Sequence, residues 1–188
     1  LEKSTVSGKI LVEKKNKEVS IPSDLWLIFS PLRNNRTEWI IEKATELGVK
    51  KIIPVITKRT VSTGVRMNRL KSIMIEALEQ CGGTFLPDLM EPDKLINWLN
   101  LWPSERQLLF CDESLLQQTS ENTISTRHTK KATAILIGPE GGFTRAEGQL
   151  IRKLKESRSI SLGPRTLRAD TAAVSAISIW QNVNSDMA

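Results

Sequence analysis

Two glycine-containing turns carry the residues of this sequence that are best suited to bind a ligand. The stretch ILIGPEGGFT places Gly138 to Gly142 after the aliphatic run 135–137, and SISLGPRTLRADTAA places Gly163-Pro164 after the run 159–162. Glycine lets backbone N–H and C=O groups approach a ligand closely, and such groups can read an adenine edge and a ribose. Neither turn contains the Gly-Lys-Ser/Thr of a phosphate-binding loop, and no GxGxxG follows a strand. Taken alone, either turn is more simply a tight reversal of the chain, but the pair indicates a nucleoside-type ligand.

Helix-start signals follow both turns. Thr144 and Glu147 have the spacing of a capping box, and Thr171 is a candidate N-cap for a helix over 172–183. In an open α/β sheet the ligand lies in the crevice at the carboxyl ends of the strands. We therefore expect the two turns to lie at the ends of neighbouring strands and to form one site.

The rest of the chain predicts alternating strands and helices, and so an α/β fold. Residues 25–29, 37–47 and 49–56 have the patterns of a strand, a helix and a strand, a βαβ unit whose strands run parallel. Apolar positions within 9–21 alternate like the last hairpin of a domain whose beginning is missing. Helical spacing places Cys81 in the core. We also expect a helix over 70–81 that ends at Gly82-Gly83, a short helix over 93–101, a strand over 108–111 and a polar loop over 119–131.

The composition restricts the classes of function. The chain has 188 residues and a formal net charge of +6. Residues 33–71 carry ten Lys/Arg against three Glu, a net +7, and residues 145–168 carry seven basic against two acidic residues, a net +5. These zones suggest a polyanionic partner, although solvated helix faces explain the charge equally well. One histidine, His128, and two cysteines offer little to a zinc site or a histidine-dependent nucleophile, and no apolar run approaches the roughly 20 residues of a membrane span.

Four motifs in a fixed order resemble a known family. EKATELGVKKIIPVITKRT, EALEQC, ILIGPEGGFTRAE and LGPRTLRADTAA are similar to the motif series of the RsmE-type 16S rRNA (uridine-N3) methyltransferases of the SPOUT superfamily. The match runs from about Leu25 to Gln181. The resemblance implies a mostly parallel sheet flanked by helices, a C-terminal trefoil knot, and a homodimer formed through the C-terminal helix region. Sequence patterns alone would not predict a knot, because true knots are rare.

The resemblance also implies a second domain. The family begins with a PUA-like RNA-binding β-barrel, of which residues 1–23 would be the tail, while residues 24–188 would be the methyltransferase domain. Gly83 stands where relatives often carry an arginine, so one expected basic contact near the site is missing.

The activity that the resemblance implies is methyl transfer from S-adenosyl-L-methionine (SAM) to N3 of a uridine in 16S rRNA, within the 30S subunit in the cytoplasm, without a metal. Two carboxylates and two guanidiniums lie within the motifs. We expect Arg168 to stabilise the uracil anion and Glu140 or Asp170 to act as the base or as an orienting group. Simpler roles exist: Asp170 could only favour a helix N-terminus, and Arg168 could be a structural partner of either carboxylate.

Binding residues follow from the same motifs. The cofactor-binding residues implied by the resemblance are Leu136, Gly138, Gly141, Gly142, Ser161, Leu162, Gly163, Leu167 and Ala172. The candidates for RNA phosphates are Arg33, Arg36, Lys58, Arg59 and Arg165. Two alternatives to the enzyme remain: a non-catalytic RNA-binding protein with a SPOUT-like fold, and a basic nucleotide-binding domain unrelated to methylation.

Overall fold

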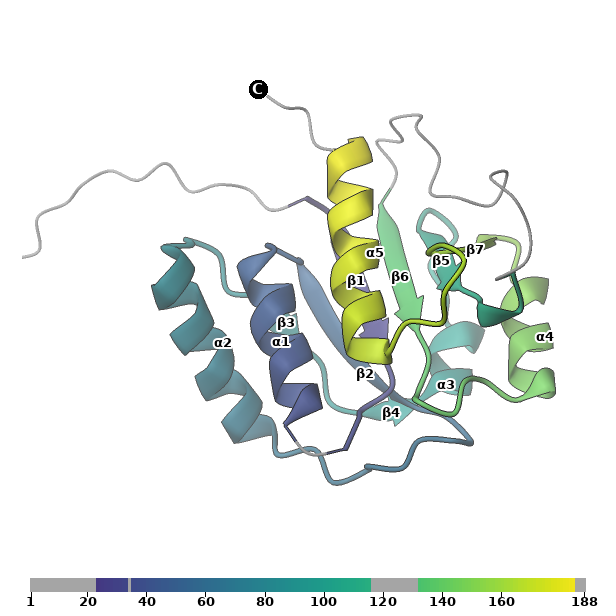
Figure 1. Cartoon of the computed structure of the whole chain (residues 1–188), viewed down its shortest axis with the longest axis horizontal. Helices are drawn as coiled ribbons and strands as arrows, with labels where there is room; N and C mark the ends of the chain where they lie inside the picture. Colours follow the sequence, from purple (N-terminus) through teal and green to yellow (C-terminus); the bar gives the residue numbers. More distant parts are fainter. Residues whose placement is uncertain (1–22, 34, 116–131, 185–188) are drawn as a thin grey trace, which may run out of the picture.

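The computed structural model describes residues 23–33, 35–115 and 132–184, and shows one sheet of parallel strands flanked by helices (Figure 1). The seven-stranded sheet has the order β3-β2-β1-β6-β5-β7, and β4 also pairs with β2. Every strand pair is parallel. The elements are β1 (Leu25–Phe29), α1 (Arg36–Glu46), β2 (Lys51–Ile56), α2 (Met67–Cys81), β3 (Asp88–Leu89), β4 (Asp93–Lys94), α3 (Leu95–Asn100), β5 (Gln107–Cys111), a 3-10 turn (Glu113–Leu115), β6 (Thr133–Ile137), α4 (Arg145–Lys153), β7 (Ser157–Ile160) and α5 (Ala169–Asn184).

Each face of the sheet is covered by its own set of helices. Side chains alternate between the two faces of a strand, so Ile135 of β6 packs with α1, α2 and α5, while Leu136 packs with α3 and α4. Figure 1 shows α5 lying over β1 and β6 beside α1. Within the described residues, no helix combines the length and the apolar character needed to cross a membrane.

Most elements lie where the sequence predicts them. The first strand has the predicted bounds, the βαβ unit is parallel, and Gly82 ends α2 in the left-handed conformation with φ 64°. The expected short helix was wrong in its first turn, because Asp93–Lys94 pairs with β2 and the helix begins only at Leu95. The hairpin expected within 9–21, the tail of a barrel at 1–23 and the loop over 119–131 lie almost entirely outside the described residues.

Four further expectations were wrong. The last strand is Ser157–Ile160, two residues before its expected place, and α5 begins at Ala169, so Thr171 lies inside the helix and is not its N-cap. Cys81 is exposed, because the buried stripe of α2 ends at Ala77. The two glycine turns do not follow neighbouring strands, since β5 lies between β6 and β7.

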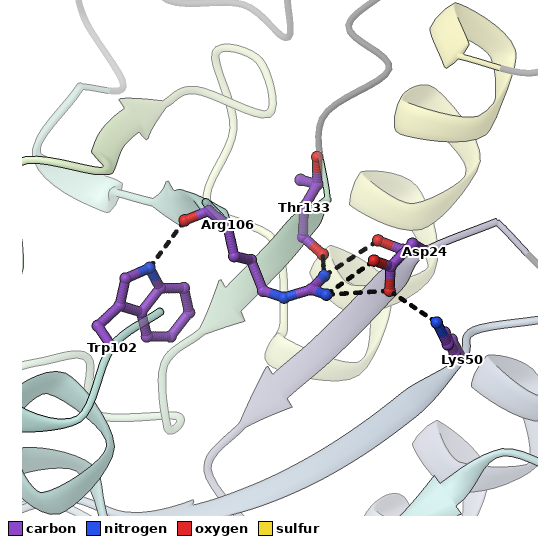
Figure 2. Close-up of polar contacts among 5 residues, drawn as sticks. All are labelled: Asp24, Lys50, Trp102, Arg106 and Thr133. Carbon is purple, nitrogen blue, oxygen red and sulfur yellow. Dashed lines mark hydrogen bonds and ion pairs between the residues drawn. The ribbon is translucent and has the colours of Figure 1, made fainter. Parts of the chain in front are cut away.

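A buried arginine joins three strands at their amino-terminal ends, on the side of the sheet away from the glycine turns (Figure 2). Arg106, only 6% exposed, precedes β5. Its Nη2 donates to both carboxylate oxygens of Asp24, at 3.0 and 2.9 Å, and its Nη1 donates to the backbone oxygens of Asp24 and Thr133, at 3.1 and 3.0 Å. The guanidinium also stacks over Trp26, with Cζ 3.6 Å from the ring centroid. The starts of β1, β5 and β6 are therefore held by one side chain.

The charge on Asp24 makes this junction sensitive to pH. Partial burial raises the pKa of Asp24, but the hydrogen bond and charge of Arg106, together with Lys50 at 3.4 Å, hold that pKa below its ordinary value. A carboxyl group with a depressed folded-state pKa contributes stability above its unfolded pKa of about 3.9, and this contribution is lost as the pH falls through the folded value.

We predict that Asp24→Asn lowers the free energy of unfolding by about 1 kcal/mol at pH 7, because the side chain is 41% exposed and its ion pairs are partly screened. Urea denaturation should show a smaller difference at pH 3, because the contribution begins to be lost below the unfolded-state pKa of about 3.9 and vanishes only below the depressed folded-state pKa. Asp88→Asn, at an exposed position of β3, is the matched control and should change little at either pH. An equal loss at both pH values would show that the Asp24 charge is not the source of the stability.

Candidate active site

A hollow at the carboxyl ends of the parallel strands is formed by three chain segments. One segment follows β5, one follows β6, and one joins β7 to α5. The hollow encloses about 470 Å³, including space open to solvent, and is lined by Cys111, Asp112, Glu113, Ile137, Gly138, Ile160, Ser161, Leu162, Arg165, Thr166, Leu167, Ala169 and Ala172. Its inner wall is apolar, with Ile137 and Ile160 almost fully buried. Such a wall suits a flat ring, with polar groups arranged at the rim.

The predicted cofactor-binding residues are partly brought together here. Those that line the hollow are Gly138, Ser161, Leu162, Leu167 and Ala172. Gly163 lies in the same turn, and Gly141 and Gly142 line a second hollow of about 1020 Å³. The two hollows share Gly138 and the segment 111–113. The Leu136 side chain packs in the core on the α3–α4 face, so only its backbone is left for a ligand.

The turn after β6 requires glycine for two different reasons. Gly142 has φ +66°, a backbone conformation that other L-residues rarely adopt. A Cβ at Gly138 would lie 2.8 Å from Cε2 of Phe143. The Phe143 ring packs edge-on against Phe110, with centroids 5.3 Å apart. The turn is therefore folded closely onto the end of β5.

The loop after β2 holds this turn from outside. The Arg59 guanidinium donates to the carbonyl oxygen of Gly141 at 2.7 Å, and the Lys58 N–H donates to Glu147 Oε1 at 2.8 Å. The predicted capping box is confirmed, because Glu147 Oε2 accepts from the Thr144 N–H at 2.9 Å and the Glu147 N–H donates to the Thr144 hydroxyl at 3.2 Å. Burial raises the pKa of Glu147, but the hydrogen bonds from Lys58 and Thr144 lower it overall. Arg59 and the backbone of Lys58, two candidates for RNA contact, thus also hold the glycine turn and the start of α4 against the loop after β2.

Arg36, predicted from the sequence to contact RNA phosphates, lies close to both predicted catalytic carboxylates, Glu140 and Asp170. Arg36 Nη1 lies 3.5 Å from Glu140 Oε1 and 3.6 Å from Asp170 Oδ2. Glu140 belongs to the turn after β6, while Asp170 lies in the first turn of α5, where its carboxylate accepts from the Thr171 N–H at 2.8 Å. Arg168 is exposed, and within the described residues no carboxylate forms an ion pair with it. The structure therefore pairs both carboxylates with Arg36 and leaves the Arg168 guanidinium accessible.

The remaining candidates are exposed. Arg33 precedes α1, Arg165 lies at the rim of the first hollow, and neither has an ion pair within the described residues. Their position is compatible with phosphate contact, which stays a prediction.

Sequence patterns missed Asp112. This carboxylate, 6% exposed, lies at the end of β5 where the two hollows meet. Its Oδ2 accepts from Arg152 Nε at 2.8 Å and from the Ser159 hydroxyl at 3.2 Å, and its Oδ1 accepts from the Ser114 hydroxyl at 2.7 Å. The sequence shows an acidic residue directly after a buried strand. Its place in the site could not be predicted, because that depends on β5 lying between β6 and β7 in the sheet.

The thiol of Cys111, the residue before Asp112, is not suited to act as a nucleophile. Burial raises its pKa far above the ordinary value, and the adjacent Asp112 charge raises it further. The thiol is therefore protonated at neutral pH and serves as part of the wall.

Comparisons with known proteins agree on one family. The profile of the family described as RNA methyltransferase domain matches residues 19–181. The chain is 32% identical to ribosomal RNA small subunit methyltransferase E of Rickettsia conorii, over 89% of this chain and 68% of that protein. It is similar to the structure of a ribosomal RNA small subunit methyltransferase E from Neisseria gonorrhoeae bound to S-adenosyl methionine, with TM-score 0.79, 31% identity, and coverage of 89% of this chain and 69% of that chain. A putative methyltransferase from Legionella pneumophila in complex with SAM gives TM-score 0.76 and 30% identity, covering 88% and 69%.

We predict that Asp112→Asn lowers the free energy of unfolding by about 2 kcal/mol, because the amide cannot accept from Arg152 and both serines as the carboxylate does. The loss should stay below that of a fully buried pair, since the Arg152 side chain is 43% exposed. Urea denaturation measures it. Glu113→Gln, at the exposed neighbouring position, should change stability by less than about 0.5 kcal/mol, and equal effects of the two substitutions would contradict the assignment.

Proposed function

Because the chain belongs to the RNA methyltransferase family, and to its branch of small-subunit ribosomal RNA methyltransferases E, we propose that it transfers a methyl group from SAM to N3 of a uridine in 16S rRNA. The enzyme is an rRNA methyltransferase, and SAM is its methyl donor. The uridine and its N3 atom are the finer part of the proposal and are supported by the motif resemblance. The observation that carries the proposal is the convergence of both glycine-containing turns on one hollow.

The first hollow fits the adenosine part of the donor. Its apolar wall of Ile137, Leu167 and Ala172 is suited to an adenine ring, and main-chain groups of both turns would read the ring edge. Asp112 is already engaged by Arg152 and two serines. Glu113 is exposed and lines both hollows, so we assign it to the hydroxyl or ammonium groups of the donor.

The chemistry places two demands on the residues of this chain. The donor supplies an electrophilic methyl group on a sulfonium. The uracil N3–H must lose its proton so that the N3 lone pair forms the new N–C bond while the C–S bond breaks. Glu140 or Asp170 would accept or orient that proton, and Arg168 would stabilise the negative charge on the uracil oxygens. The accessible guanidinium of Arg168 supports this role.

The proposal extends to assembly and substrate. The chain returns from β7, at the edge of the sheet, to α5, which packs against α1 and β6 (Figure 1), and this path supports the trefoil knot that the resemblance implies. The partly exposed Val174 and Ile179 on α5 support a homodimer formed through this helix. We propose 16S rRNA within the 30S subunit, in the cytoplasm, as the substrate, with Arg33, Lys58, Arg59 and Arg165 contributing to RNA binding. The division into a PUA-like tail and a methyltransferase domain belongs to the same proposal.

Methyl transfer is tested directly on ribosomal subunits. The protein is incubated with SAM and with 30S subunits from a strain that lacks the modification, and the rRNA is mapped by mass spectrometry. We expect one new 3-methyluridine. Methylation at another atom would overturn only the finer assignment. Absence of any methylated product, with RNA binding retained and no SAM binding by calorimetry, would favour a non-catalytic RNA-binding protein.

Arg168→Ala separates catalysis from cofactor binding. We predict that kcat falls about 100-fold, because a group that stabilises developing charge is removed, while SAM affinity measured by calorimetry stays within about threefold. Arg168→Lys, which keeps the charge, should recover part of the rate. A loss of SAM affinity as large as the loss of kcat would instead make Arg168 a cofactor-binding or structural residue.

A further inference from the structure

Arg36 stands at a junction of three elements. It is the first residue of α1, and its guanidinium contacts the turn after β6 through Glu140 and the start of α5 through Asp170. These two contacts come from two of the chain segments that form walls of the first hollow: Gly138 belongs to the same turn as Glu140, and Ala169 and Ala172 flank Asp170. Arg36 therefore spans the two walls from outside.

The position is electrostatically unusual. A cation at a helix N-terminus is disfavoured by the helix dipole, whereas carboxylates are favoured there. Asn35, which precedes α1, makes no side-chain capping hydrogen bond within the described residues, and Asp170 lies at the N-terminal end of a second helix, α5. The unfavourable placement of Arg36 is offset by the two carboxylates, so the charges at this junction stabilise one another only when α1, the turn and α5 are together.

We propose, on the basis of the function proposed above, that Arg36 is a positioning residue that holds the two walls of the SAM site in register. Its guanidinium fixes the glycine turn against the first turn of α5, so that a donor entering the hollow meets both walls at their binding distance. The same ion pairs have a second effect. Because Glu140 and Asp170 are compensated by Arg36, they do not draw Arg168 into an ion pair, and its guanidinium stays available to the uracil.

Binding of SAM in the absence of RNA distinguishes this role from phosphate contact. We expect Arg36→Gln to weaken SAM binding about fivefold by calorimetry without any RNA present, because the two ion pairs are partly exposed and each is of modest strength. Arg36→Lys, which keeps one point charge, should recover part of the affinity. The matched control is Lys43→Gln on the same helix, whose ammonium also lies between two carboxylates, Glu42 and Glu46, at 2.7 and 2.8 Å, and which should leave SAM affinity unchanged.

A double-mutant cycle tests the route of the effect. If Arg36 acts through Glu140, the loss of SAM affinity in Arg36→Gln/Glu140→Gln will be smaller than the product of the two single losses. Thermal denaturation of each variant excludes general unfolding. Unchanged SAM affinity in Arg36→Gln, with a higher KM for RNA and a flatter salt dependence, would overturn the inference and return Arg36 to phosphate binding. Multiplicative losses in the cycle would also overturn it. Failure of the wild type to bind SAM would instead contradict the proposed function.

Discussion

The proposed SAM site can form only if the turn after β6 is held in place at the end of its strand. The turn must expose main-chain groups at the end of a buried strand, and its glycines give it little stability of its own. Three contacts hold it in place. Arg59 donates to the carbonyl oxygen of Gly141, and Arg36 forms an ion pair with Glu140. Glu147, in the capping box that follows the turn, accepts from the loop after β2. Arg59 and Arg36 both come from the first third of the chain, so the βαβ unit of β1, α1 and β2 supports a turn that belongs to the last third.

Several carboxylates at the two ends of the sheet are paired with arginines from other elements. At one edge of the sheet, Arg106 and Asp24 neutralise each other where three strands begin. At the other edge, Asp112 is satisfied by Arg152 and serines, and Glu140 and Asp170 by Arg36. Each buried or half-buried carboxylate near the hollow has a cation from a different element. Arg165 lines the hollow and Arg168 lies three residues further along the same segment, and both side chains are exposed.

Local patterns were sufficient for the parts of the structure that depend on local interactions. The β1 strand, the Thr144–Glu147 capping box and the Gly82 end of α2 follow from residues within one turn or strand, and all three are present. The order of the strands depends on non-local pairing, so the position of β5 between β6 and β7 was not visible, and neither was Asp112. The contacts of Arg36 with Glu140 and Asp170 could not be predicted, because these partners lie more than 100 residues further along the chain. The charge pattern singled out Arg36 but could not assign its partners, and its contact with RNA stays a prediction.

Hydrogen exchange, followed by mass spectrometry with and without SAM, tests most directly whether the two turns form one site. We expect saturating SAM to slow exchange in peptides covering 136–143 and 160–172 together, with identical dependence on SAM concentration. Peptides covering Asp24 and Arg106, at the opposite edge of the sheet, should be unaffected. Protection of only one turn, or protection centred away from both, would show that the two turns do not form one SAM site.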